Sequence, residues 1–395
     1  MWRVGFFFHE MSFGLLSIFL PLYIVSVGGS LLDVGLMASV AILLAIPASL
    51  FWGYVCDKRG KYKRYILISF LASSTLLYFF TFTRNIGLFI ILYGVMAVFH
   101  VAHEPPKNVL IAELYSRNEW EKSFAFYEGF TEIGWLIGLV LGMFISLIGF
   151  NSSTTLLLCS GLNFLAFALS LFLVSDPPLI FERGLVRIER SVDFTFRGLT
   201  VASKVLDGLH VSGSLAEENL TLFCGGLVLF VFATSTLFTP LPIFLAQNLQ
   251  LTTSMVYALY VLNSGAGVIG YFLASNRIEV HEEKMHLQKI VMIRSILAFL
   301  LAIFTILSIQ TVTMFASVLV LMGFAYALYH VCVLSLSMEL IPPGKAGLFD
   351  ALIGLGSAAG AYLGPFIAQT FNFIYAFILS GATFLLAYIS FKASS

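Results

Sequence analysis

Charged residues are scarce in this sequence. Asp, Glu, Lys and Arg make up 11% of its 395 residues, while 59% are hydrophobic. Soluble globular proteins carry about 25% charged residues. The composition therefore excludes an ordinary soluble domain and indicates a chain that crosses a membrane many times.

Close cysteine pairs and nucleotide-binding loops are also missing. The four cysteines, Cys56, Cys159, Cys224 and Cys332, lie far apart, which excludes a clustered zinc or redox motif. No glycine-rich loop ending in Lys-Ser or Lys-Thr is present, so nothing predicts ATP as an energy source. The net charge is zero and predicts no nucleic-acid partner. We expect no cofactor.

Long apolar runs dominate what remains. About 20 apolar residues make one helical crossing of a bilayer. By that measure the sequence predicts an all-α membrane protein with twelve spans, near residues 5–27, 31–56, 65–83, 87–112, 122–147, 154–174, 220–245, 252–275, 288–309, 312–340, 346–370 and 373–392.

The spans form two sets of six. The polar stretch 175–219 between them is mixed in charge and predicts a linker, so the domains are expected at 1–174 and 220–395. With both termini in the cytoplasm, 18 of the 21 Lys and Arg fall on the inner side and Arg84 alone on the outer side. This positive-inside asymmetry predicts a multi-pass protein of the cell membrane with both termini and the linker cytoplasmic.

A charged loop joins the second and third spans. Its pattern resembles the corresponding loop of the major facilitator superfamily of secondary transporters, although Tyr62 replaces a usual cation, a role that Lys63 or Arg64 could take. The residues that carry the resemblance are Gly53, Asp57, Lys58, Gly60 and Lys61. The resemblance implies two pseudo-symmetric six-helix bundles that rock about a central binding site.

The same resemblance implies a cytoplasmic gate. In the family the carboxylate at the place of Asp57 docks on the start of span 11, where a helix N-terminus attracts an anion. Asp350 in the first turns of that span is expected to receive Lys61, Lys63 or Arg64.

Ionisable residues inside the first-half spans need an explanation, because each one costs about 2.5–3.5 kcal/mol at the bilayer centre. Span 4 contains two prolines, Pro105 and Pro106, which predict a kink beside its charged residues. Topology places the whole group in the inner half of the first bundle. Its members are His9, Glu10, His100, His103, Glu104, Lys107, Glu128 and Glu132.

This group contains four carboxylates and one lysine. Crowded carboxylates favour sharing a proton, and a carboxyl that takes up a proton is what proton coupling requires. The alternative is a static network, with Lys107 paired to Glu128 or Glu132, that only holds two helices together.

The second half offers fewer polar residues. Tyr326, Tyr329 and His330 in span 10 are expected to form an aromatic wall facing the charged group. Arg294 lies about one and a half turns into predicted span 9, so we expect it to extend to the inner surface. Spans 5 and 11 carry glycines four residues apart, a pattern that predicts close helix packing.

The sequence therefore predicts a secondary transporter, acting as a monomer, for a small-molecule substrate and protons. The direction favoured is proton-coupled export of a small amphipathic or cationic organic compound, and proton-coupled uptake of a small organic solute is the alternative. The histidines and carboxylates of spans 1 and 4 also allow a divalent metal as substrate, by ligand type. A fourth possibility is a transporter fold that serves as a sensor or binding protein.

Overall fold

The computed structural model of the chain describes residues 2–114, 120–176, 220–274, 283–340 and 346–394. Every regular element in these residues is helical. Eleven helical stretches among them are long and apolar enough to cross a membrane. The less apolar α3 (Tyr62–Phe80) is a further long helix and corresponds to predicted span 3. The helices thus match the twelve spans expected from the sequence.

The first half of the chain runs through α7. Besides α3, its helices are α1 (Val4–Ser26), α2 (Leu31–Arg59), α4 (Ile86–His100), the 3₁₀ turn η1 (Val101–His103), α5 (Glu104–Leu114), α6 (Trp120–Ile148) and α7 (Ser152–Leu173).

The second half begins at α9. Its helices are α9 (Leu220–Phe238), α10 (Leu241–Gln247), α11 (Thr253–Ala274), α12 (Glu283–Ile306), α13 (Val312–Leu340), α14 (Ala346–Thr370) and α15 (Phe373–Ala393). Of the predicted linker, residues 175 and 176 alone are described, so the domain boundaries remain a prediction.

Polar residues at span ends act as caps. Ser30 and Asp33 form a reciprocal capping box at the start of α2, which accounts for the isolated Asp in that apolar run. Asn85 and Asn151 cap α4 and α7 with their side-chain oxygens. Gly60 ends α2 in the left-handed conformation, at φ 63°, which glycine adopts without strain.

Prolines interrupt two spans. Pro105 and Pro106 follow the point where α4 changes to a 3₁₀ turn before α5 resumes, as predicted. Pro240 separates α9 from α10. The sequence analysis did not anticipate this second break, which splits predicted span 7.

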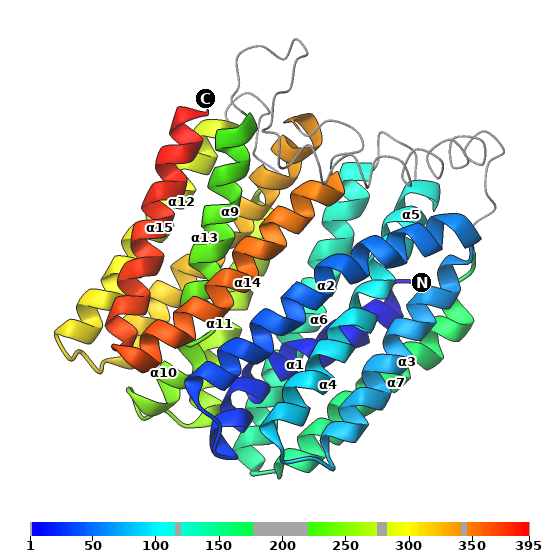
Figure 1. Ribbon diagram of the computed structural model, residues 1–395, viewed down its shortest axis with the longest axis horizontal. Helices are drawn as coiled ribbons and strands as arrows, with labels where there is room; N and C mark the ends of the chain where they lie inside the picture. Colours follow the sequence, from blue (N-terminus) through cyan, green and yellow to red (C-terminus); the bar gives the residue numbers. More distant parts are fainter. Residues whose placement is uncertain (1, 115–119, 177–219, 275–282, 341–345, 395) are drawn as a thin grey trace.

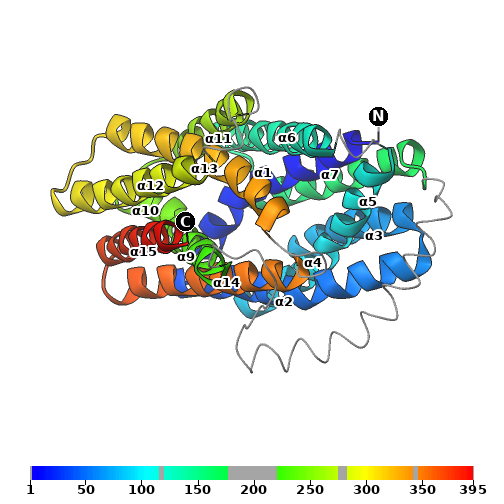
Figure 2. The ribbon, with the colours of Figure 1, turned by 90° about the horizontal axis from the view of Figure 1, so that it is seen from above.

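The two halves meet along two seams (Figures 1 and 2). α2 packs antiparallel against α14 on one side, and α6 packs against α11 on the other. Within the halves, α1 lies against α6 and α7, while α9 lies against α14 and α15. This arrangement leaves a space between the halves that α1, α4, α9 and α13 border.

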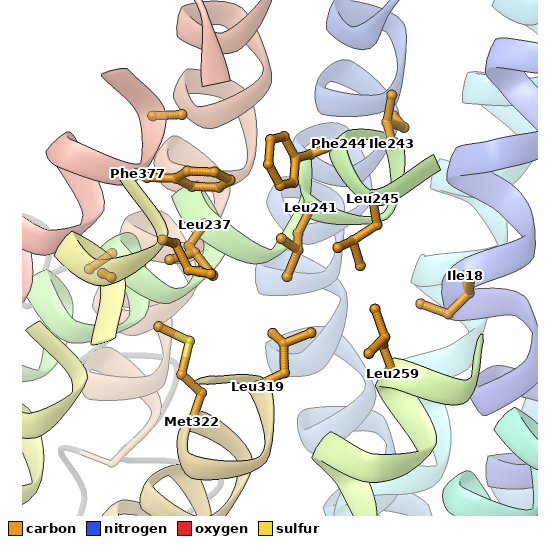
Figure 3. Close-up of a cluster of buried hydrophobic side chains, with 14 of the residues drawn as sticks. Ile18, Leu237, Leu241, Ile243, Phe244, Leu245, Leu259, Leu319, Met322 and Phe377 are labelled. Carbon is orange, nitrogen blue, oxygen red and sulfur yellow. The ribbon is translucent and has the colours of Figure 1, made fainter. Parts of the chain in front are cut away.

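Two hydrogen bonds between the halves lie toward the predicted outer end. Tyr257 Oη on α11 donates to the Leu15 carbonyl on α1 (2.8 Å), and the Leu32 backbone N–H donates to Gln369 Oε1 on α14 (2.7 Å). Figure 3 shows Ile18 of α1 lying near Leu245 and Leu259, beside the buried side chains of α9 and α10. Apolar side chains of the two halves therefore meet toward the predicted outer end.

Glycines let the helices within each half approach closely. A Cβ at Gly138 would collide with the Met11 backbone, and one at Gly360 with the Phe232 backbone. These glycines place α6 on α1 and α14 on α9, which are equivalent pairs in the two halves. The glycine patterns of spans 5 and 11 therefore serve packing, as the sequence predicted.

Candidate functional site

A cavity of about 530 Å³ lies between the two halves. Its walls come from α1, α2, α4 and α6 on one side and from α9, α11, α12 and α13 on the other. Most lining groups are apolar or aromatic, and a few are polar, as in ligand sites for small organic molecules. Tyr93 lines it from α4.

Glu132 on α6 is the acidic residue of this wall. Ser264 Oγ on α11 donates a hydrogen bond to Glu132 Oε1 (3.2 Å), so the carboxylate bridges the halves. Of the two partners expected for Lys107, Glu128 is among the ion pairs of the described residues and Glu132 is not; Glu104 is the other partner. Glu132 thus belongs to the cavity and stands apart from the rest of the predicted group.

The three histidines of the predicted group lie together. His9 Nδ1 donates to Asn163 Oδ1 (2.6 Å), whose amide nitrogen in turn donates to Ser12 Oγ (2.7 Å). Because this fixes Nδ1 as the protonated nitrogen of a neutral His9, its Nε2 accepts from His100 Nδ1 (3.0 Å). The sequence analysis did not single out Asn163, which is completely buried and orients His9.

The remaining members form a second chain of contacts. His103 Nδ1 faces the His100 carbonyl (2.5 Å), which can only accept, so this nitrogen carries a proton. His103 Nε2 lies 3.2 Å from Glu104 Oε1. A hydrogen bond there requires one further proton, on either the imidazole or the carboxyl.

Lys107 extends this series of contacts to a second carboxylate. Its ammonium group pairs with Glu104 and lies 3.6 Å from Glu128 Oε1. The Lys107 side chain is 10% exposed, whereas the Glu104 and Glu128 side chains are 42% and 37% exposed. The structure therefore brings α5 and α6 together through Lys107 and leaves the carboxylates open on one side. Glu10 is half-buried on α1 and forms no hydrogen bond or ion pair with the part of the chain that the structure describes.

The histidine cluster also has the composition of a metal site. One nitrogen from each of His9, His100 and His103 lies within 4.8 Å of the others. Imidazole suits divalent transition ions. Contacts with protein groups already occupy both nitrogens of His9, both nitrogens of His103 and Nδ1 of His100, so the rings are held largely as a hydrogen-bonded network.

The aromatic residues of span 10 separate into two environments. Tyr326 lines the cavity, and His330 stacks beside it at a centroid distance of 6.2 Å. Tyr329 is 4% exposed and stacks on Phe230 inside the second half, at 3.4 Å. Of Tyr326, Tyr329 and His330, which were expected to form one wall, Tyr326 lines the cavity, His330 stacks beside it and Tyr329 packs in the core.

Arg294 corrects another expectation. We expected this side chain to extend to the inner surface, but it is 1% exposed and borders the cavity. Its helix, α12, begins at Glu283, five residues before the predicted start, so Arg294 lies deeper than the sequence suggested. A buried cation beside the cavity was the main functional feature that sequence reasoning missed.

The predicted gate is described on one side. Asp57, Lys58 and Arg64 are exposed at the junction of α2 and α3, and Lys61 immediately precedes α3. No atom lies within 4 Å of a Cβ built at Gly53, so space does not require a glycine there. The backbone of span 11 is described from Ala346, but residues 341–345 and the side chain of Asp350 lie outside what the structure describes, so the docking of Asp57 stays a prediction.

Comparison with known proteins identifies the family. The model of the Major Facilitator Superfamily matches residues 4–349. The chain belongs to the Major Facilitator Superfamily. It is therefore a multi-pass membrane protein and a secondary transporter, and the fold predicted from the sequence is confirmed.

Similar members of the Major Facilitator Superfamily include multidrug resistance proteins named MdtG. The chain is 33% identical over 121 residues to the one from Rahnella sp. (strain Y9602), covering 29% of each chain. It is 28% identical over 178 residues to the one from Klebsiella pneumoniae (strain 342), covering 44% of this chain and 42% of the relative. The aligned part thus spans less than half the length of either relative.

A solved structure of the same fold covers nearly the whole chain. It is a partially occluded inward-open conformation of the xylose transporter XylE from E. coli, with a TM-score of 0.69 and 14% sequence identity. The alignment covers 98% of this chain and 97% of that one. At this identity the likeness concerns the fold.

Proposed function

We propose that this transporter exports a small amphipathic organic compound from the cytoplasm in exchange for protons. The observation that carries the proposal is Glu132, a carboxylate in the wall of the central cavity that bonds to Ser264 of the opposite half. A carboxylate in that position is in reach of the substrate, takes up or releases a proton, and makes a contact that depends on how the two halves are placed. The multidrug resistance proteins among the relatives support export as the direction.

Proton exchange at this site follows from electrostatics. A carboxylate in a largely apolar cavity gains stability by taking up a proton, and substrate competes for the same space. When Glu132 is protonated its negative charge is lost, and the hydrogen bond from Ser264 weakens with it. Proton binding therefore loosens one contact across the α6–α11 seam, which couples it to rearrangement of the halves.

A network of four residues on the predicted cytoplasmic side supports the same function; its members are His103, Glu104, Lys107 and Glu128. In it, His103 Nε2 lies 3.2 Å from Glu104 Oε1, and the side chains of Glu104 and Glu128 are both more than a third exposed. Exposed carboxylates exchange protons with water readily. We propose that this network supplies protons to and removes them from the inner end of the pathway.

The topology and assembly belong to the same proposal. Both termini and the 175–219 linker face the cytoplasm, the domains are residues 1–174 and 220–395, and the protein works as a monomer in the inner membrane. With this orientation, the closed end of the structure is the outer one.

The test is transport by purified protein in liposomes. A thermal-shift screen first finds a ligand, since a compound at 100 times its Kd adds about 2.7 kcal/mol of stability. We expect a proton gradient to drive accumulation of that compound, and Glu132→Gln to abolish the accumulation while exchange of labelled for unlabelled substrate continues. The glutamine keeps the size and hydrogen-bonding capacity of the side chain but cannot ionise.

Ser264→Ala separates the two parts of this mechanism, because it removes the hydrogen bond across the seam and keeps the carboxylate. We expect it to retain proton-driven accumulation only in part, since proton binding at Glu132 no longer loosens a contact between the halves. Accumulation against a gradient by Glu132→Gln would refute coupling at this residue. Inverting the gradient distinguishes export from uptake, and saturable binding without exchange would identify a sensor.

A further inference from the structure

Arg294 is a buried cation without a conventional partner. Among the described residues, none accepts a hydrogen bond from its Nε, Nη1 or Nη2 atoms, and each of these atoms is shielded from solvent. A guanidinium group carries five N–H donors and stays charged at neutral pH. Leaving all of them unpaired in a membrane-spanning helix is unfavourable, so the arrangement requires a compensating role.

Four aromatic rings surround the guanidinium. Its carbon lies 5.0 Å from the ring centre of Phe230, 5.1 Å from Phe384, 5.4 Å from Tyr326 and 5.8 Å from Phe238. Cation–π attraction of this kind stabilises the charge but satisfies no N–H donor. The shell thus holds the side chain in place while leaving its hydrogen-bonding capacity unused.

Two of these rings also belong to the cavity wall. Tyr326 and Phe238 both flank the guanidinium and line the central cavity, and Arg294 itself borders it. Tyr326 is 42% exposed, so its ring has room to move on the cavity side. Rotation of that ring about its side-chain bonds would bring the N–H donors into contact with a molecule in the cavity.

We propose that Arg294 binds the anionic group of the substrate, so that the transported compound is an aromatic organic anion such as a carboxylate. A planar guanidinium matches a carboxylate through two parallel hydrogen bonds. The aromatic shell accommodates the ring of the same molecule. This inference rests on the proposed function, in that it takes the central cavity as the substrate site.

The opposite wall fits this assignment. Glu132 lines the cavity from the first half, whereas Arg294 lines it from the second. If the substrate is an anion bound at Arg294, Glu132 remains available to bind the proton. A cationic substrate would instead compete with the proton for the Glu132 carboxylate. The class of substrate expected from the sequence, amphipathic or cationic, is therefore narrowed to an amphipathic anion.

Three probes with the same aromatic body test the charge preference: 2-naphthoate, its methyl ester and 2-naphthylmethylammonium. Binding to the full chain in detergent is measured by the change in fluorescence of Trp135, which lines the cavity, in a variant whose other tryptophans are replaced by phenylalanine. We expect 2-naphthoate to bind about tenfold more tightly than the ester, a difference of about 1.4 kcal/mol. The ammonium compound is expected to bind more weakly than the ester.

Arg294→Gln should remove the preference for the acid and leave ester affinity within about threefold, a change of under 1 kcal/mol. Arg294→Lys should keep part of the preference, because the charge remains and the bidentate geometry is lost. Lys289→Gln, an exposed cation on the same helix, is the matched control and should behave like the unaltered protein.

Equal affinity for acid and ester in the unaltered protein would overturn the proposal, as would a preference that survives in Arg294→Gln. If Arg294→Gln does not fold, the comparison of the three probes on the unaltered protein and on Arg294→Lys still decides. These measurements need no gradient. A preference for the acid without transport would therefore support the anion site and contradict the proposed function. Transport without a preference for the acid would support the proposed function and contradict the anion site.

Discussion

Lys107 is the cation that balances the carboxylates of Glu104 and Glu128 in the first half. Lys107 is nearly buried, and Glu104 and Glu128 share it. Removing one partner of a buried cation costs more than the pair contributes, because the remaining charge loses its compensation. The two carboxylates are not equivalent, since Glu104 also contacts His103 and Glu128 lies at 3.6 Å.

We therefore predict that Glu104→Gln lowers the free energy of unfolding by roughly 1–3 kcal/mol, the cost of an unsatisfied buried polar group. Glu128→Gln is the matched variant and should cost less than about 1 kcal/mol, as expected for a longer, partly exposed pair. Thermal unfolding of the purified variants measures both. A larger loss for Glu128→Gln than for Glu104→Gln would contradict this ranking.

The membership of this network was largely predictable from the sequence, and its pairing was not. Intramembrane charge identified His103, Glu104 and Lys107, because such residues need partners. The partner of Glu132 is Ser264, from the other half, which no spacing rule connects to it. Arg294 was misplaced for a geometric reason: α12 starts at Glu283, so the residue lies about 16 Å along the helix, too deep to reach its end.

Helices pack through glycine surfaces that are equivalent in the two halves. Gly138 of α6 faces α1, and Gly360 of α14 faces α9. At both positions a Cβ would meet backbone atoms, which cannot move aside as a flexible side chain can. The contact between the two helices of each pair therefore depends on the missing side chain.

Gly360→Ala should lower the free energy of unfolding by roughly 1–3 kcal/mol, as expected for overpacking. Gly265→Ala on α11 is the matched control, because no atom lies within 4 Å of a Cβ built there. We expect it to be neutral or slightly stabilising, since alanine favours helices. Thermal unfolding compares the two, and equal stability of both variants would show that the α9–α14 contact adapts.

At this scale the sequence was informative about where helices lie and how some are interrupted. Apolar runs predicted each long helix to within a few residues, because a bilayer demands about 20 apolar residues per crossing. The break at Pro105 and Pro106 was predicted from the loss of backbone hydrogen bonds. The break before α10 was missed, since the run stays uncharged through Pro240 and the apolar residues resume directly after it.

The whole molecule is organised as two halves joined at one end. Seams α2–α14 and α6–α11 hold the halves together, and their contacts near Tyr257 and Gln369 lie at the predicted outer end. The repeat of six spans and the loop at Gly60 indicated this architecture from the sequence. Which end would be closed could not be predicted, because both conformations of an alternating-access transporter use the same sequence.

The contact between Tyr257 and Leu15 offers a test of this closure. Tyr257 is 1% exposed, and its hydroxyl donates to a carbonyl of the other half, so the bond exists when the outer end is closed and breaks when the halves separate there. A hydrogen bond contributes about 0.5–1.5 kcal/mol net. Its removal should therefore shift the equilibrium toward the outward-open state by roughly two- to tenfold.

We predict that Tyr257→Phe increases the population of long distances between spin labels at positions 26 and 248, in a background whose native cysteines are replaced. Ser26 and Asn248 are exposed and lie on opposite halves at the predicted outer end. Tyr375→Phe is the matched control, because it removes the same hydroxyl from a tyrosine that is 57% exposed on α15. If the distance distributions of the two variants coincide, the bond is also made when the outer end is open, and closure depends on the apolar packing around Ile18.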